Sequence, residues 1–279
     1  MNVITMLGLP FLACMLLTGM LGYLGLHVLK REVIFIDIAV AQVAALGGIA
    51  AHMLFHVHGD SPQALACAVG ATLVVALGFA IARRRVSRLP IEATIGITYA
   101  IAAGGALLLV GKSSCGHSHV QDMLTGSLLW VQWKDLAVAA IVLAGAGGGL
   151  ILCRRPFQEI SDDYQDAIRK GRRVAVWDFL FYALCGIVIT FAVRLAGVVV
   201  VFCFLIIPAT ASALLARTWV RRLLLAWGTG LVGSIAGLFL CSGFDFSAGV
   251  SVSACLGGTL LAAAAAAKLV GVARKESVA

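Results

Sequence analysis

The stretch Gly197–Ala216 (GVVVVFCFLIIPATASALLA) is the feature that most limits how this chain can fold. It runs without a charged side chain over about the length that a helix needs to cross roughly 30 Å of hydrocarbon. Pro208 removes a backbone hydrogen bond, which lipid tolerates only where neighbouring helices, hydroxyls or water compensate. The small residues after Pro208 allow other backbones to approach closely. We therefore predict a helix kinked at Pro208 inside a bundle, either as a packed structural helix or beside a pathway.

Eight further apolar segments accompany this stretch. The chain of 279 residues is 61% hydrophobic and 12% charged, with a mean hydropathy of +1.03, whereas soluble domains carry about 25% charged residues. The nine candidate spans are 6–29, 33–55, 63–82, 91–110, 134–153, 174–194, 197–216, 222–241 and 248–270. We predict an all-α polytopic membrane protein, one transmembrane domain over residues 1–279 with about nine helices. Eight or ten spans are the alternatives, because 123–133 resembles an interfacial segment and the joint at 194–197 is short.

The basic residues predict the orientation of these spans. If nine spans alternate, one side of the membrane receives the clusters at 30–31, 83–88, 154–155, 169–173, 217–222 and 268–275. Only Lys112, Lys134 and Arg194 fall on the other side. The positive-inside rule then places the N-terminus outside and the C-terminus in the cytoplasm. Lys30 and Arg31 follow the first apolar run, the reverse of the order in a cleavable signal peptide, so we expect that segment to remain as a span. The net charge of +8 accordingly reflects cytoplasmic loops and does not indicate nucleic-acid binding.

The longest polar stretch, 154–173 (RRPFQEISDDYQDAIRKGRR), lies on the predicted cytoplasmic side. Its acidic residues precede its basic residues, and a glycine follows, which is the order expected for a short helix. Ser161 is the predicted N-cap, and Ile160, Tyr164 and Ile168 are spaced to share one helical face. Two interpretations remain open, a solvated loop helix or a docking element for a cytoplasmic partner.

Histidines gather on the predicted outer face. They are His52, His56 and His58 at the end of the second span, and His117 and His119 beside Cys115 in the loop after the fourth. On a helix, His52 and His56 would project from one face, a usable spacing for two ligands of zinc. Each cluster alone could consist of ordinary polar loop residues. Two clusters on the same side favour contact with a metal ion at the outer face.

Ionisable side chains within spans are costly and therefore candidates for a function. Asp37 and Glu92 are such residues. Gln42 begins a stripe that continues through residues 45, 49, 52 and 56 on one helical face, from mid-membrane to the outer histidines. An ion path would require such a stripe, so we predict Asp37, Gln42 and Glu92 as pathway residues. For Glu92 there is also a structural interpretation, because the helix dipole stabilises a carboxylate in the first turn.

The sequence gives little support for an intramembrane enzyme, for nucleotide binding or for a disulfide framework. An intramembrane enzyme would need a nucleophile paired with a base, or an HExxH motif, and the predicted spans contain neither. The segment Gly105–Ser114 (GALLLVGKSS) has Ala106 where a phosphate-binding loop needs glycine, so we expect no nucleotide binding. The eight cysteines are scattered without a CxxC motif, which indicates small helix residues and no disulfide framework.

The segment LIIPATASALLAR at 205–217 resembles the late-helix signature of the permease subunits of metal-importing ABC transporters of the zinc/manganese type. Residues 31–47 resemble the second-helix motif of that family, Gly-Asp-x-Leu-x-His. Residues 92–97 resemble its Asp-Thr-x-x-Gly-Ile element, and residues 244–249 its Asp-x-Pro-x-Gly turn. Gln42 stands where the family has histidine, Asp37 is displaced by one position, and the 244–249 turn lacks the proline.

The resemblance implies a multi-pass permease of the bacterial cytoplasmic (inner) membrane, a homodimer that is not itself an enzyme and has no permanently bound cofactor. A cytoplasmic ATPase subunit would dock at 156–173, and an extracytoplasmic metal-binding protein would deliver a divalent metal ion to the histidine-bearing face. Zinc is the first expected ion, with manganese and iron as alternatives. The rival hypotheses are an ion-coupled secondary metal transporter or channel without an ATPase, and a siderophore- or cobalamin-type permease.

Overall fold

The computed structural model describes residues 3–56, 61–85, 89–110, 128–244 and 246–276. Within these residues nine helices are long and apolar enough to cross a membrane, and no strand occurs. This confirms the predicted all-α polytopic fold. The predicted spans differ from the helices by a few residues at most; the span predicted at 222–241, for example, corresponds to Trp219–Phe244.

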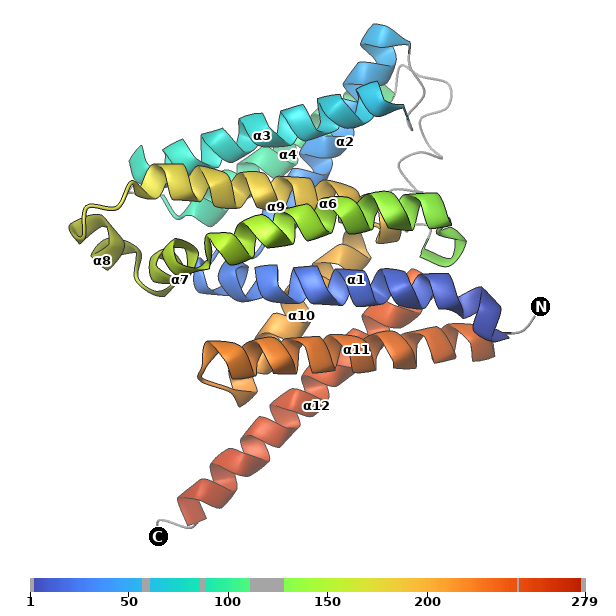
Figure 1. The fold of residues 1–279 in the computed structure, drawn as a ribbon, viewed down its shortest axis with the longest axis vertical. Coiled ribbons are helices and arrows are strands. Elements are labelled where there is room, and N and C mark those ends of the chain that lie inside the picture. The colour runs from blue at the N-terminus through green and yellow to red at the C-terminus, as the bar shows by residue number, and fades with distance from the viewer. Residues whose placement is uncertain (1–2, 57–60, 86–88, 111–127, 245, 277–279) are drawn as a thin grey trace. The chain divides into compact units, whose positions relative to one another are not determined.

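The elements follow one another along the chain as in Figure 1. They are α1 (Val3–Lys30), α2 (Ile36–Phe55), α3 (Pro62–Arg85), α4 (Ile91–Val110), η1 (Leu128–Trp130), α6 (Trp133–Leu152), α7 (Arg154–Asp162), α8 (Tyr164–Arg169), α9 (Val174–Ala196), α10 (Val198–Leu215), α11 (Trp219–Phe244) and α12 (Ala248–Glu276). The described part of the 123–133 segment contains the single 3₁₀ turn η1.

Two compact units divide the chain, and each draws on separated stretches of sequence. Unit 1 comprises Met1–Leu29, Thr125–Val138 and Leu195–Ala279, and unit 2 comprises Lys30–Leu124 and Ala139–Arg194. Because the two units interleave along the sequence, neither is a domain formed by one continuous segment. The expectation of one permease domain over 1–279 stays a prediction.

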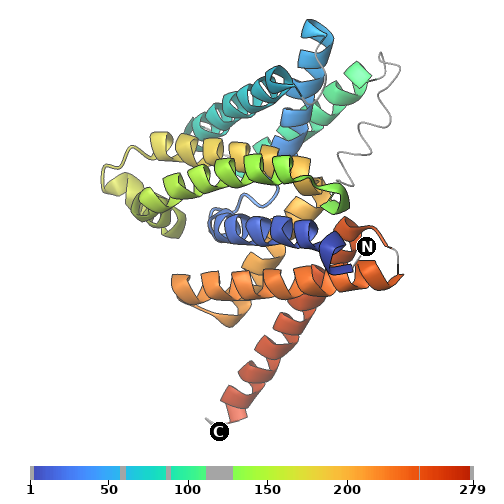
Figure 2. The same ribbon diagram turned by 45° about the vertical axis from the view of Figure 1, so that its right-hand side comes forward.

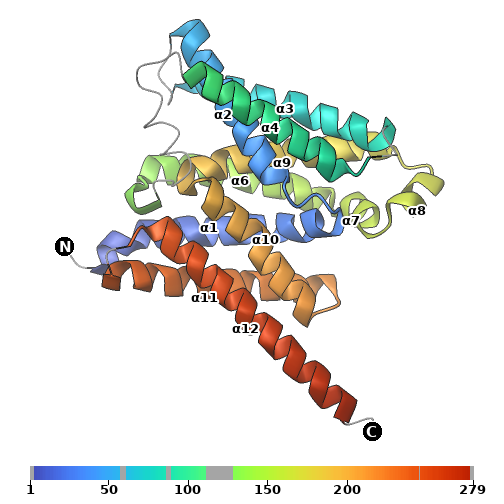
Figure 3. The same ribbon diagram turned by 180° about the vertical axis from the view of Figure 1, so that it is seen from behind.

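Small residues bring the helices of unit 1 close together. Gly25 of α1 faces the carbonyl of Leu205 in α10, so closely that a side chain at position 25 would collide with that backbone. The indole Nε1 of Trp227 in α11 donates a hydrogen bond to the Gly19 carbonyl of α1 at 3.0 Å, and α12 crosses α11 and packs against it (Figure 3). Close backbone approach through glycine is a common way for membrane helices to associate.

The proline-containing helix α10 has one special residue at its start and one inside it. Gly197 precedes α10 with φ 84° and ψ 160°, a region of backbone conformation that essentially only glycine adopts. It allows the chain to turn directly from the end of α9 into α10. Pro208 is buried within α10, as predicted for a residue inside a bundle. Its role as a kink beside a pathway stays a prediction.

In unit 2, α2 packs against both α3 and α4 (Figures 2 and 3). A side chain at Gly47 of α2 would lie 2.9 Å from the Cys67 carbonyl and 2.9 Å from the Ala71 Cβ of α3. On the neighbouring helix α9, a Cβ at Gly186 would lie 3.2 Å from Thr72 of α3. Because these contacts leave little space between the helices, α2 and α9 are both held in position against α3.

The polar stretch 154–173 contains two helices, so the prediction of one short helix capped by Ser161 is wrong. The chain is extended at Asp163, with φ −148° and ψ 103°, between α7 and α8. The Asp163 side chain accepts a hydrogen bond from the backbone N–H of Asp166 at 2.9 Å and is the N-cap of α8. Aspartate is a strong N-cap because its carboxylate satisfies a free N–H at a helix start. Asp163 therefore starts a new helix where the sequence suggested a continuous one.

We predict that Gly237→Ala in α11 destabilises the folded protein by about 1–3 kcal/mol, the usual effect of overpacking. A Cβ at Gly237 would collide with the backbone of Val252 in α12, which can move only if the helix moves. Gly228 lies on the same helix with open space around it and supplies the control, Gly228→Ala. Thermal unfolding in detergent measures both variants, and equal melting temperatures would contradict the prediction.

Candidate translocation and coupling site

Glu92 holds the connection between α1 and α2. Its carboxylate accepts a hydrogen bond from the backbone N–H of Ile34 at 2.8 Å. It lies in the first turn of α4 and is half-buried. In the structure Glu92 therefore ties the segment 31–35, which we name the 31–35 joint, to the start of α4.

Asp37 lies one turn further on, at the start of α2. The residue is 1% exposed, and neither carboxylate oxygen has a hydrogen-bond partner of ordinary geometry among the described residues. Because α2 begins only at Ile36, Asp37 belongs to the first helical turn, where the N-terminal dipole favours a negative charge. A buried carboxylate without a partner inside a span is a candidate for contact with a cation or proton.

Asp37 and Gln42 lie on different faces of α2. Five residues separate them, which corresponds to about 140° of rotation around a helix. Asp37 is buried, Gln42 is half-buried and His52 is exposed. The half-exposed face that begins at Gln42 therefore continues to His52, while Asp37 lies on the buried side of the helix.

The predicted histidine pair does not share one helical face. The helix α2 ends at Phe55, and His56 caps it in the left-handed conformation, with φ 52° and ψ 32°. Both His52 and His56 are exposed. The spacing of two ligands four residues apart assumes a helix through both residues, whereas α2 ends one residue before His56. Contact of this pair with a metal ion stays a prediction.

The second predicted cluster and His58 of the first cannot be placed. His58, Cys115, His117 and His119 lie outside the described residues. Among the residues that are described, no three His, Cys, Asp or Glu side chains come together in a group that could hold a metal ion. The role of the outer face in metal contact stays a prediction.

A buried ion pair lies where the 31–35 joint meets α9. Arg31 Nη1 lies 2.7 Å from Asp178 Oδ1, and both side chains are 0% exposed. The guanidinium carbon lies 4.0 Å from the ring centre of Phe181, a cation–π contact. Burial lowers the pKa of Arg31 from its ordinary value, while the negative charge of Asp178 acts in the opposite direction.

The same arginine reaches α7. Its Nε donates a hydrogen bond to Ser161 Oγ at 2.9 Å, and Ser161 in turn donates to the Phe157 carbonyl at 2.7 Å. Lys30, next to Arg31, forms an ion pair with Asp162 at the end of α7. Ser161 is therefore a link between α7 and the 31–35 joint, in place of the predicted N-cap.

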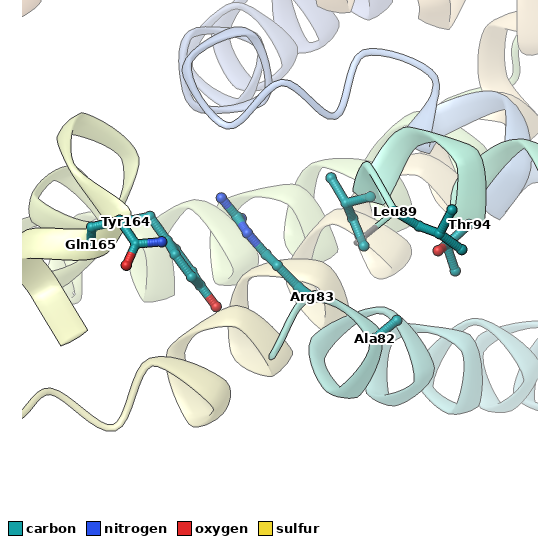
Figure 4. Close-up of a pocket in the computed structure, with 7 residues that line it drawn as sticks. Ala82, Arg83, Leu89, Thr94, Tyr164 and Gln165 are labelled. Atoms are coloured by element: carbon teal, nitrogen blue, oxygen red, sulfur yellow. The ribbon is translucent and has the colours of Figure 1, made fainter. Parts of the chain in front are cut away.

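A second arginine approaches Asp178 from the end of α3. Arg83 Nη1 lies 3.7 Å from Asp178 Oδ1 and donates a hydrogen bond to the Tyr182 hydroxyl at 3.1 Å. Its guanidinium carbon lies 4.3 Å from the ring centre of Tyr164 in α8, and Figure 4 shows the two side chains next to each other. Burial and the negative charge of Asp178 raise the pKa of Tyr164 to about 12, so the phenol stays neutral at physiological pH.

The three predicted coupling residues differ in exposure. Ile160 is 1% exposed and packs with Ala167 and Val174, against which Tyr164 also packs. Tyr164 is half-buried, and Ile168 is 48% exposed. The break at Asp163 causes this difference, because it ends the face that one continuous helix would have presented.

Tyr164 lies between two cavities. A cavity of about 240 Å³ extends from Tyr164 and Gln165 to Arg83 and Thr94 (Figure 4). A second cavity, of about 440 Å³, lies among Tyr164, Ile168, Arg84 near the end of α3 and the residues from Arg172 to Val176 at the start of α9. Tyr164 is therefore the residue that lines both cavities.

Asp178 is the functional candidate that the sequence interpretation missed. It lies in the second turn of α9, a span whose other charged residue, Arg194, is in the last turn, and an ionisable residue inside a span is by itself a signal. Arg83 was counted as part of a basic cluster, with no partner assigned. Its partners come from α8 and α9, which are distant in sequence.

The ABC 3 transport family matches residues 4–267 of the chain. The chain belongs to this family. It is 27% identical over 247 residues to the manganese transport system membrane protein MntC of Halalkalibacterium halodurans, covering 86% of this chain and 80% of that protein. It is 31% identical over 147 residues to the manganese import system permease protein ScaB of Streptococcus pneumoniae, 53% of this chain and 50% of that protein.

A solved structure has the same fold as this ABC 3 family member. PsaBC from Streptococcus pneumoniae in complex with Fab aligns with a TM-score of 0.75 and 20% identity, covering 92% of this chain and 90% of that chain. The family and the nine apolar helices confirm a multi-pass transport subunit of an ABC system, which is not itself an enzyme.

We predict that Asp178→Asn lowers the free energy of unfolding by about 3–5 kcal/mol, because it leaves the Arg31 charge buried without its partner. The control is Glu159→Gln, which removes an ion pair with Arg172 whose side chains are 43% and 44% exposed. Such exposed pairs contribute at most about 1 kcal/mol. Denaturation in detergent compares the variants, and an equal loss in both would show that burial of the Arg31–Asp178 pair has no special weight.

Proposed function

We propose that this chain is the membrane-spanning permease subunit of an ATP-driven importer for a divalent metal ion, acting as a homodimer. The observation that most supports this proposal is the pair α7 and α8. This short polar element is held to the rest of unit 2 by the contacts of Arg31 with Ser161 and of Lys30 with Asp162. Membership of the ABC 3 family supports an ATPase partner at this element. An extracytoplasmic binding protein would deliver the ion to the opposite, histidine-bearing face.

The identity of the ion follows from ligand chemistry and from the relatives. Carboxylate and amide oxygens suit manganese, whereas imidazole suits zinc. The in-span candidates Asp37, Gln42 and Glu92 offer oxygen donors, and His52 and His56 do not share a helical face. Two similar proteins are named for manganese transport. We therefore place manganese ahead of the zinc expected from the histidines, with iron as a further alternative.

The Gln42 face of α2 is the proposed route through unit 2. It is half-exposed at Gln42 and exposed at His52, so it can meet an ion or a second subunit. Asp37 would meet the ion only after α2 rotates or shifts, because it is buried in the present arrangement. Glu92 contributes by fixing the 31–35 joint, through its hydrogen bond to Ile34.

The proposal predicts ATP-dependent metal accumulation in proteoliposomes that contain this chain, the ATPase subunit and the binding protein. Manganese should accumulate faster than zinc or iron. Gln42→Ala should lower the initial rate about 10-fold or more, a loss of at least about 1.4 kcal/mol, since it removes an oxygen donor from the proposed route. Ala45→Ser on the same face serves as the control. Uptake by the chain alone, driven by an ion gradient, would favour the secondary transporter or channel.

The exposure difference within α7 and α8 generates a separate prediction. Ile168→Asp should abolish co-purification of the ATPase subunit without lowering the melting temperature, because Ile168 is exposed. Ile160→Asp should lower the melting temperature, because it places a charge in a buried apolar cluster. Retention of the ATPase by Ile168→Asp would exclude this face as the docking surface.

A further inference from the structure

The 31–35 joint is held from two directions. On one side Arg31 bonds to Ser161 of α7 and Asp178 of α9. On the other side the Ile34 N–H bonds to Glu92 of α4. Val33 within the joint is fully buried, so the joint cannot move independently of these helices. Since α2 begins directly after the joint, these contacts set the position of its first turn.

Asp178 is shared unequally between two arginines. Its Oδ1 lies 2.7 Å from Arg31 and 3.7 Å from Arg83. Its Oδ2 and the Nη2 of Arg31 are buried without hydrogen-bond partners among the described residues. By distance and angle Asp178 Oδ2 and Arg31 Nη2 are free to accept and to donate one more hydrogen bond, and the Tyr164 hydroxyl also interacts with Asp178. A second arrangement, with Asp178 closer to Arg83, would keep the carboxylate compensated without exposing it to water.

Arg83 connects this buried cluster to the proposed docking surface. Its side chain is 13% exposed, yet it lies against the ring of Tyr164 in α8. Tyr164 lines both cavities and is half-buried, so a partner bound at α8 would touch it directly. A displacement of Tyr164 changes the position of the Arg83 guanidinium relative to Asp178.

We propose that Asp178, Arg31 and Arg83 form a charge junction that carries movement of α7 and α8 to the start of α2. Arg31 and Arg83 compete for Asp178, so a shift of α8 that alters the Arg83 contact also alters the Arg31 contact. The 31–35 joint follows Arg31, and the first turn of α2 follows the joint. These three are positioning residues, which touch neither ATP nor the transported ion. This inference rests on the proposed function.

The test compares transport with ATP hydrolysis in the reconstituted complex. Arg83→Gln removes the competing charge but leaves the Arg31–Asp178 pair in place. We expect the variant to assemble with the ATPase and to hydrolyse ATP, while the manganese transported per ATP falls about 2- to 30-fold, the range for residues that modulate coupling between sites. A residue with a purely structural role would lower both activities together and leave the ratio unchanged.

Three further variants make the result decisive. Lys268→Gln removes an exposed basic residue of α12, outside both the charge junction and the 154–173 stretch, and should keep the wild-type ratio. Tyr164→Phe retains the ring beside Arg83 and should also keep it, whereas Tyr164→Leu should lower it as Arg83→Gln does. If Arg83→Gln fails to assemble with the ATPase subunit, the comparison of Tyr164→Phe with Tyr164→Leu tests the proposal instead.

Two negative results have different meanings. A wild-type ratio in both Arg83→Gln and Tyr164→Leu would overturn the charge junction and leave the proposed function intact. Absence of ATP-dependent uptake by the unchanged chain would overturn the proposed function itself, and this is seen before any variant is measured.

Discussion

The buried ion pair between Arg31 and Asp178 is the interaction on which the arrangement of unit 2 depends. Removing a guanidinium and a carboxylate from water costs several kcal/mol for each ion, which only a close and well-oriented contact offsets. Both side chains are 0% exposed and 2.7 Å apart. The 31–35 joint and α9 must therefore meet at this point, and Ser161 brings α7 to the same arginine.

This constraint joins two parts of the molecule that a transporter must coordinate. The short helices α7 and α8 are the proposed contact for an ATPase, and α2 carries the proposed route for the ion. Within unit 2, the contacts of Arg31 and Arg83 with Asp178 lie between these short helices and the start of α2, and they connect the two parts. Two residues of 154–173 have different roles in this proposal. Ile160 is buried and stabilises the packing of α7 and α8, whereas Ile168 is exposed and can contact a partner.

Sequence reasoning succeeded where the signal is local. The spans follow from the length of apolar runs, because every backbone polar group in lipid must be satisfied within a helix. It failed at helix ends. Asp163 starts a new helix with its own side chain, and His56 adopts the left-handed conformation. Both outcomes depend on competition between nearly equal local conformations, which periodicity alone does not resolve.

The amino-acid sequence by itself determined the class of protein, the approximate bounds of the nine spans seen in the described residues, and the candidate residues Asp37, Gln42 and Glu92. Only the tertiary structure decided which polar groups meet. Arg31 bonds to Ser161 and Asp178, which are 130 and 147 residues away in the chain. An apolar run is a property of neighbouring residues, whereas the pairing of buried charges depends on how distant helices pack. Asp178 therefore acquired a partner, and a proposed role, only in the folded chain.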